Sequence, residues 1–113
     1  MKKLKQKFQG ALIGTLVGDA LGMPVEGWPP QAIVQEYSQL REMLASRLGK
    51  GTYTDDTQMM IAVAESLVHC KGFNGEDMAR RFLDNYDPRR GYGSGTVLAL
   101  QFLRRGVPWH QTG

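Results

Sequence analysis

Apolar residues recur along most of the chain with the three- and four-residue spacing of amphipathic helices. The clearest stripe follows Pro30, with steps of four, three, four and four residues: Ile33, Tyr37, Leu40, Leu44 and Leu48. Such spacing places side chains on one face of an α-helix. Because proline is well tolerated in a first turn and glycine ends helices, we expect a helix from about Pro30 to Gly49 and Gly51.

Four further helices are predicted from apolar spacing and from flanking glycine, proline and asparagine. They cover about residues 7–21, 57–71, 75–86 and 97–103. Asn74 is placed to cap the third of them, and Asp87-Pro88 to end it. Strict alternation of polar and apolar residues, the mark of a half-buried strand, occurs nowhere in the chain. The predicted fold class is therefore all-α.

Glycine recurs every fourth residue in the first predicted helix, at Gly10, Gly14, Gly18 and Gly22. Four-residue spacing puts the four glycines on nearly one face, because a turn takes 3.6 residues. Each glycine costs a helix up to about 1 kcal/mol relative to alanine. The stripe thus indicates close approach of another backbone in tight packing, or else direct contact with a ligand.

Length and cysteine content restrict the class of protein. A chain of 113 residues allows one domain. The single cysteine, Cys70, cannot form an internal disulfide, so a disulfide-stapled secreted protein is excluded. One cysteine and two histidines are too few ligands for a typical cysteine-based zinc site, so this kind of site is nearly excluded.

The net charge of +3 belongs to a basic tail, residues 1–7, which holds four lysines and no acid. Without this tail the chain is close to neutral, and no basic stripe interleaved with aromatic residues appears, so we expect no nucleic-acid partner. Lysines before the apolar run 11–18 imitate a signal peptide, but glycines dilute that run and Asp19 ends it. The run is also shorter than a membrane span. We expect a cytoplasmic protein without a membrane partner.

The segment around Asp55 and Asp56 carries the strongest chemical signal. Two hydroxyl residues, Thr54 and Thr57, flank the adjacent carboxylates at the start of an apolar helix. A helix cap accounts for one acid and one hydroxyl, with Gln58 completing a capping box. Neighbouring carboxylates repel each other unless a cation lies between them. A hard divalent cation such as Mg²⁺ takes oxygen ligands of this kind. From composition alone, the cap and the metal site both remain open.

Two weaker candidates lie elsewhere. A glycine-rich run before the last predicted helix lets backbone N–H groups approach an anion, although such runs are usually simple turns. It comprises Arg90, Gly91, Tyr92, Gly93, Ser94, Gly95 and Thr96. Glu26 stands in the loop that follows the first helix, where a lone glutamate is usually solvated.

Together and in this order, the three features resemble the ADP-ribosylglycohydrolase family of the dinitrogenase-reductase-activating type. The resemblance rests on the run from Gly10 to Glu26 that contains Gly18-Asp19-Ala20-Leu21-Gly22, on Tyr53-Thr54-Asp55-Asp56-Thr57-Gln58-Met59, and on Arg90 to Thr96. It covers essentially the whole chain, as the N-terminal portion, residues 1–113, of a domain that is longer in the family.

The resemblance implies an orthogonal bundle of helices and a site with two Mg²⁺ or Mn²⁺ ions. It implies that Thr54, Asp55 and Asp56 are metal ligands, with both aspartates catalytic, and that Glu26 is a catalytic acid near the scissile bond. It also implies that the substrate is held by five residues: Gly91, Tyr92, Gly93, Ser94 and Gly95. The family hydrolyses the bond between C1 of ADP-ribose and a protein side chain or a small conjugate, so an ADP-ribosylated protein or conjugate is the expected partner.

One feature of the family is absent. A second acidic motif of the Asp-x-Asp-Thr type is expected toward the C-terminus, and none of the six aspartates forms it. We therefore expect a truncated or split chain of doubtful activity alone, completed by a C-terminal chain and exposing apolar faces around Leu12, Leu16, Leu98 and Phe102. The alternative is a catalytically incomplete module that binds ADP-ribose or a protein partner.

Overall fold

The computed structural model describes all residues from Met1 to Gly113. Helices and short 3₁₀ turns make up its regular structure, and no strand is present, which confirms the all-α prediction. Two compact units are distinguishable within the chain, residues 1–54 and residues 55–113.

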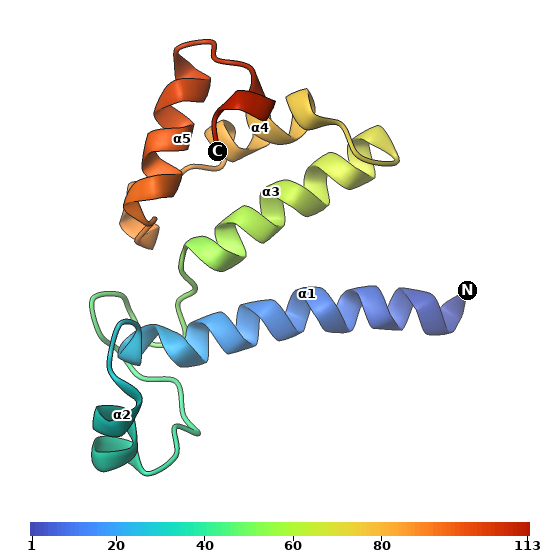
Figure 1. The fold of residues 1–113 in the computed structure, drawn as a ribbon. Coiled ribbons are helices and arrows are strands. Elements are labelled where there is room, and N and C mark those ends of the chain that lie inside the picture. The colour runs from blue at the N-terminus through green and yellow to red at the C-terminus, as the bar shows by residue number, and fades with distance from the viewer. The chain divides into compact units, whose positions relative to one another are not determined.

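The first unit begins with the long helix α1, Lys2–Gly22, which is unbroken in Figure 1. It starts five residues earlier than expected, because lysine and glutamine are good helix formers and nothing in residues 2–6 breaks a helix. The 3₁₀ turn η1, Met23–Val25, follows directly. The buried apolar residues of this unit are Ala20, Met23, Pro24 and Val25, so its small core lies at the C-terminal end of α1.

The glycine stripe of α1 meets no neighbouring backbone within its own unit, residues 1–54. A Cβ atom at Gly10, Gly14, Gly18 or Gly22 would meet no atom within 4 Å. The close approach of another backbone to the stripe stays a prediction. Apolar side chains of the same helix are also uncovered, since Leu12 and Leu16 are 40% and 37% exposed.

Helix α2, Pro30–Tyr37, is much shorter than the predicted helix. The Ser38 N–H donates to the Val34 carbonyl at 2.8 Å, and the Ser38 φ of 56° then turns the backbone out of the helical region. The expected continuation to Gly49 is wrong, because Leu40, Leu44 and Leu48 are half-buried without being helical. Their four-residue spacing reflects packing of a loop.

By length and composition alone, the 24 residues of α1 and η1 together, Lys2–Val25, could cross a membrane. Core helices of soluble proteins and signal sequences meet the same criterion. The expectation that the apolar run 11–18 is too short for a membrane span is therefore wrong, because the helical segment that contains it is long enough. The absence of a membrane partner and the cytoplasmic location stay predictions.

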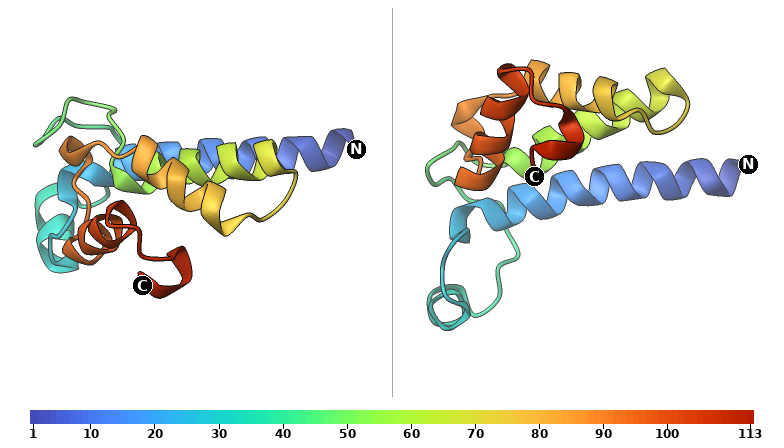
Figure 2. Two further views of the ribbon diagram at one scale, coloured as in Figure 1. Left: turned by 90° about the horizontal axis from the view of Figure 1, so that it is seen from above. Right: turned by 45° about the horizontal axis from the view of Figure 1, so that its top comes forward.

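The second unit contains three helices, α3 (Asp55–Cys70), α4 (Gly75–Asp84) and α5 (Ser94–Arg104). A tight turn follows α3, with Lys71 at a φ of 55°, and α4 then runs back along α3 (Figures 1 and 2). Asn74 caps α4 as predicted, because its Oδ1 accepts the Asp77 N–H at 2.9 Å. Ala62, Ser66 and Leu100 are among the buried residues of this unit.

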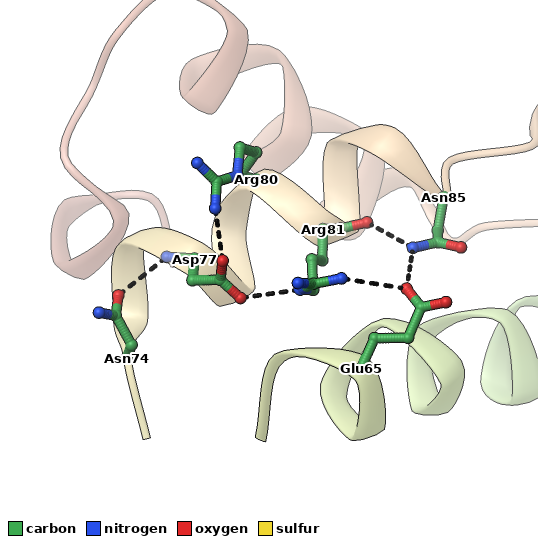
Figure 3. A network of polar contacts seen from close by, with 6 residues as sticks. All are labelled: Glu65, Asn74, Asp77, Arg80, Arg81 and Asn85. Carbon is green, nitrogen blue, oxygen red and sulfur yellow. Dashed lines mark hydrogen bonds and ion pairs between the residues drawn. The ribbon is translucent and has the colours of Figure 1, made fainter. Parts of the chain in front are cut away.

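A polar network built around Asp77 joins α3 to α4 (Figure 3). The Asp77 carboxylate is nearly buried, at 5% exposed, and accepts from the guanidinium groups of Arg80 and Arg81. Arg81 also forms an ion pair with Glu65 of α3 at 3.7 Å, and the Asn85 amide donates to the same carboxylate at 3.0 Å. The hydrogen bond from Arg81 is the main reason that the pKa of Asp77 lies well below its usual range.

The C-terminal segment folds back onto the start of α4 (Figure 2). It contains the 3₁₀ turn η3, Trp109–Gln111. The Trp109 ring lies directly over Gly75 and meets Phe73 edge-on, with the ring centroids 5.6 Å apart. Leu98 is half exposed as expected, whereas Phe102 is partly covered.

Candidate functional site

Thr54 is the last residue of the first unit, and its side chain is 1% exposed. Asp19, in the last turn of α1, accepts two hydrogen bonds from it. The Thr54 backbone N–H donates to Oδ2 at 2.9 Å, and the Thr54 hydroxyl donates to Oδ1 at 2.5 Å. The residue before the acidic pair is thus held to α1 through both its backbone and its side chain.

Asp55 and Asp56 occupy the first turn of α3. Acidic side chains are stabilised there by the helix dipole, by about 0.3–1 kcal/mol each. Gln58 does not serve α3 alone, because its side-chain nitrogen donates to the Asn85 carbonyl at 2.7 Å and links α3 to the end of α4. No three His, Cys, Asp or Glu side chains in residues 1–113 are grouped so that they could hold a metal ion among themselves.

Glu26 lies just after η1 and is paired with Arg47. The distance between the Arg47 guanidinium and the Glu26 carboxylate is 2.9 Å, and both side chains are over 40% exposed. Exposed pairs of this kind contribute about 0.2–1 kcal/mol, so the pair can open readily. No local pattern in the sequence indicates this partner, which is 21 residues away.

The glycine-rich run connects the 3₁₀ turn η2, Pro88–Arg90, to α5. Gly91 has a left-handed backbone with a φ of 84°, a conformation that glycine adopts without strain. Gly93 is the N-cap of α5 and contributes no side-chain cap. The first N–H groups of a helix lack intrahelical partners. Ser94 and Gly95 are exposed, so their N–H groups can donate to an acceptor on a ligand.

Tyr92 links this run to the acidic segment. Its ring lies edge-on to Tyr86, with the centroids 4.8 Å apart, and Arg104 sits over the Tyr86 ring at 5.2 Å. Burial is the main cause that raises the pKa of Tyr92, and the negative charges of Asp55 and Asp87 raise it further. The second unit therefore brings Asp55 within electrostatic range of the predicted substrate residue Tyr92.

Arg89 and Arg90 are both turned toward Asp87. The Arg89 guanidinium donates to the two Asp87 oxygens at 3.0 Å each, and Arg90 forms an ion pair at 3.6 Å. The hydrogen bond from Arg89 is the main reason that the pKa of Asp87 is lowered. One carboxylate thus orders both cationic side chains in front of Gly91.

Similarity to known proteins agrees with these observations. The sequence profile of the ADP-ribosylglycohydrolase family matches residues 1–113. The chain belongs to this family. An uncharacterized protein of Archaeoglobus fulgidus is 38% identical over 97% of the chain, and the ADP-ribosylhydrolase ARH3 of Danio rerio is 41% identical over 86% of it. The human ADP-ribosylhydrolase ARH3 is 37% identical over 86% of the chain.

A solved structure supports the family fold. The chain matches an ADP-ribosylglycohydrolase-related protein complex with a TM-score of 0.67 and 38% identity over 88% of its length. It spans 33% of that chain, and it spans 38%, 27% and 29% of the three relatives named above. The family resemblance and the helical fold class are therefore confirmed, while the predicted roles of the site residues stay predictions.

Sequence reasoning placed Asp19 within a family motif and gave it no role of its own. In the structure it accepts two hydrogen bonds from Thr54, which is 35 residues away. Its place in the family motif was the only signal that it could matter.

Proposed function

We propose that the chain supplies the first part of the active site of a Mg²⁺- or Mn²⁺-dependent ADP-ribosyl hydrolase. The substrate is an ADP-ribosylated protein or a small ADP-ribosyl conjugate. The bond cleaved is the N- or O-glycosidic bond at C1 of the ribose.

The observation that supports this proposal is the hydrogen bonding of Thr54 to Asp19, directly before two adjacent carboxylates. Its hydroxyl proton is engaged by Asp19, so its oxygen lone pairs remain available to a cation. Asp55 and Asp56 add the oxygens of two carboxylates. An all-oxygen set with two negative charges fits hard cations such as Mg²⁺ and Mn²⁺. Two such ions, when bound, would polarise the ribose hydroxyls and lower the pKa of a water.

The glycine-rich run is suited to the diphosphate or the ribose. Gly91 and Gly93 leave the backbone open to close approach, and the exposed N–H groups at the start of α5 favour an anionic acceptor. The Tyr92 hydroxyl keeps its proton at neutral pH, because its pKa is raised, and can therefore donate to a sugar oxygen. This run and Asp55 lie in the same unit.

Glu26 is proposed to move a proton at the glycosidic bond. The transition state at C1 is oxocarbenium-like, and a carboxylic acid assists departure of the leaving group. Opening the exposed pair with Arg47 would free the Glu26 carboxylate for this role at small cost.

Titration of ADP-ribose into the full chain, with and without Mg²⁺, tests the proposal. We expect binding that depends on Mg²⁺ and weakens at least tenfold when Asp55→Asn and Asp56→Asn are combined. A matched control removes two exposed carboxylates of the same unit, with Glu76→Gln and Asp84→Asn, and should bind like the parent. Hydrolysis is followed in parallel as release of ADP-ribose from arginine- and serine-linked peptides.

The outcomes separate the hypotheses. Equal binding by the parent and the acidic-pair variant would remove Asp55 and Asp56 from the site. Mg²⁺-dependent binding without release of ADP-ribose would instead support the alternative, a module that binds without hydrolysing.

A further inference from the structure

Both carboxylate oxygens of Asp19 accept a hydrogen bond from Thr54. Oδ2 accepts the Thr54 N–H at 2.9 Å, and Oδ1 accepts the Thr54 hydroxyl at 2.5 Å. In the second bond the Thr54 hydroxyl is the donor, so its proton is directed at Oδ1. The rotation of the Thr54 hydroxyl is thereby fixed.

The direction of the Thr54 hydroxyl proton decides which side of the oxygen can bind a cation. A threonine hydroxyl has one proton and two lone pairs, and it ligates a cation only through a lone pair. With its proton directed to Asp19, Oγ1 turns its lone pairs elsewhere. The negative charge of Asp19 also strengthens the hydroxyl as a donor of electron density, as carboxylates behind metal ligands commonly do.

We propose that Asp19 is a positioning residue for the cation site: it fixes the Thr54 hydroxyl with its lone pairs available to the metal. The inference rests on the proposed function, because it assigns Asp19 a role through Thr54 and not through contact with substrate. The competing role is purely structural, in which the same two hydrogen bonds only hold the end of α1 to the segment before α3.

Four variants of the 113-residue chain separate the two roles, with Mn²⁺ alone as the probe. Asp19→Asn replaces one acceptor oxygen with an amide donor, so one donor of Thr54 loses its partner. Thr54→Val keeps the shape and the backbone N–H but removes the hydroxyl, whereas Thr54→Ser keeps the hydroxyl. The fourth variant combines Asp19→Asn with Thr54→Val. Glu36→Gln, an exposed carboxylate of α2, is the control for loss of charge.

Free Mn²⁺ is measured by electron paramagnetic resonance, and folding of each variant by circular dichroism. Loss of a group behind a metal ligand typically weakens metal affinity by about 10- to 100-fold, so we expect Asp19→Asn to raise the Kd for Mn²⁺ at least tenfold. Thr54→Val should have a similar effect, and Thr54→Ser and Glu36→Gln little. Because both residues act through one hydroxyl, Asp19→Asn should add little in the Thr54→Val background.

Two results would overturn the positioning role while leaving the proposed function standing. One is a folded Asp19→Asn variant that binds Mn²⁺ as tightly as the parent chain does. The other is full additivity of Asp19→Asn and Thr54→Val, which would mean that Asp19 acts independently of the hydroxyl. A parent chain that binds no Mn²⁺ would overturn the cation site itself and the positioning role with it.

Discussion

Alanine at position 75 would test how the C-terminal segment is held. A Cβ atom on Gly75 would lie 2.5 Å from Cζ2 and 2.6 Å from Cδ2 of Trp109, and closer still to Cε2. Carbon atoms pack best at about 3.5–4.0 Å, so the ring must retreat by about 1 Å or leave its position. The φ of Gly75 is not in the left-handed region, so the backbone itself accepts alanine.

Two effects of opposite sign decide the change in the free energy of unfolding. Alanine favours a helix over glycine by up to about 1 kcal/mol, and by less at the first helical residue. Overpacking a well-filled contact costs about 1–3 kcal/mol. Trp109 is 41% exposed. Its complete release would uncover on the order of 130 Å² of apolar surface, worth about 3 kcal/mol at ~25 cal/mol per Å². We expect Gly75→Ala to destabilise the second unit by about 1–3 kcal/mol.

The measurement is urea unfolding followed by the fluorescence of Trp109, with Trp28 replaced by phenylalanine so that one indole reports. A red-shifted emission of the folded variant would accompany the loss of stability. Gly95→Ala is the control, because a Cβ at that helical position meets no atom within 4 Å. An unchanged midpoint and emission maximum in Gly75→Ala would refute the packing of Trp109 on Gly75.

Two more predictions follow from α4 and α1. The pKa of Asp77 is lowered in the folded state, so its contribution to stability is complete above the unfolded-state pKa near 3.9 and is lost as the pH falls below that value. The difference between the urea midpoints of the parent and of Asp77→Asn should therefore be constant near pH 7 and shrink progressively as the pH falls below about 4, and a pH-independent difference would contradict this role. Gly14→Ala should stabilise α1 by up to about 1 kcal/mol, because its Cβ meets no atom within 4 Å and alanine is the better helix former. Lower helicity by circular dichroism would instead indicate a neighbour on the glycine stripe.

Local signals predicted the helices of the second unit well. Asn74 capping α4 and the apolar period of α3 depend on residues within a few positions of each other, which the sequence displays directly. The period after Pro30 misled, because leucines at 40, 44 and 48 suit a helical face and a packed loop equally. The helix ends because the backbone of Ser38 has a positive φ, and a hydrophobic pattern does not encode this conformation.

Long-range pairs in the candidate site were beyond sequence reasoning. The acidic pair and the glycine-rich run were recognised from their composition. The partners Asp19 and Arg47 were not, because 35 residues separate Asp19 from Thr54 and 21 separate Arg47 from Glu26. An aspartate or arginine without a local motif has many possible partners, and only the path of the chain selects one.

The network around Asp77 also changes how the molecule presents itself to polyanions. Adjacent arginines on an exposed helix are typical contacts for a phosphate backbone, and their neutralisation releases condensed counterions. Here the charges of Arg80 and Arg81 are balanced by Asp77 and Glu65 within one set of ion pairs. A polyanion that bound to α4 would therefore release few counterions, because these two arginines are already neutralised. The ionic-strength dependence of any non-specific association would then arise from cations outside this network, among them the four lysines in the first two turns of α1.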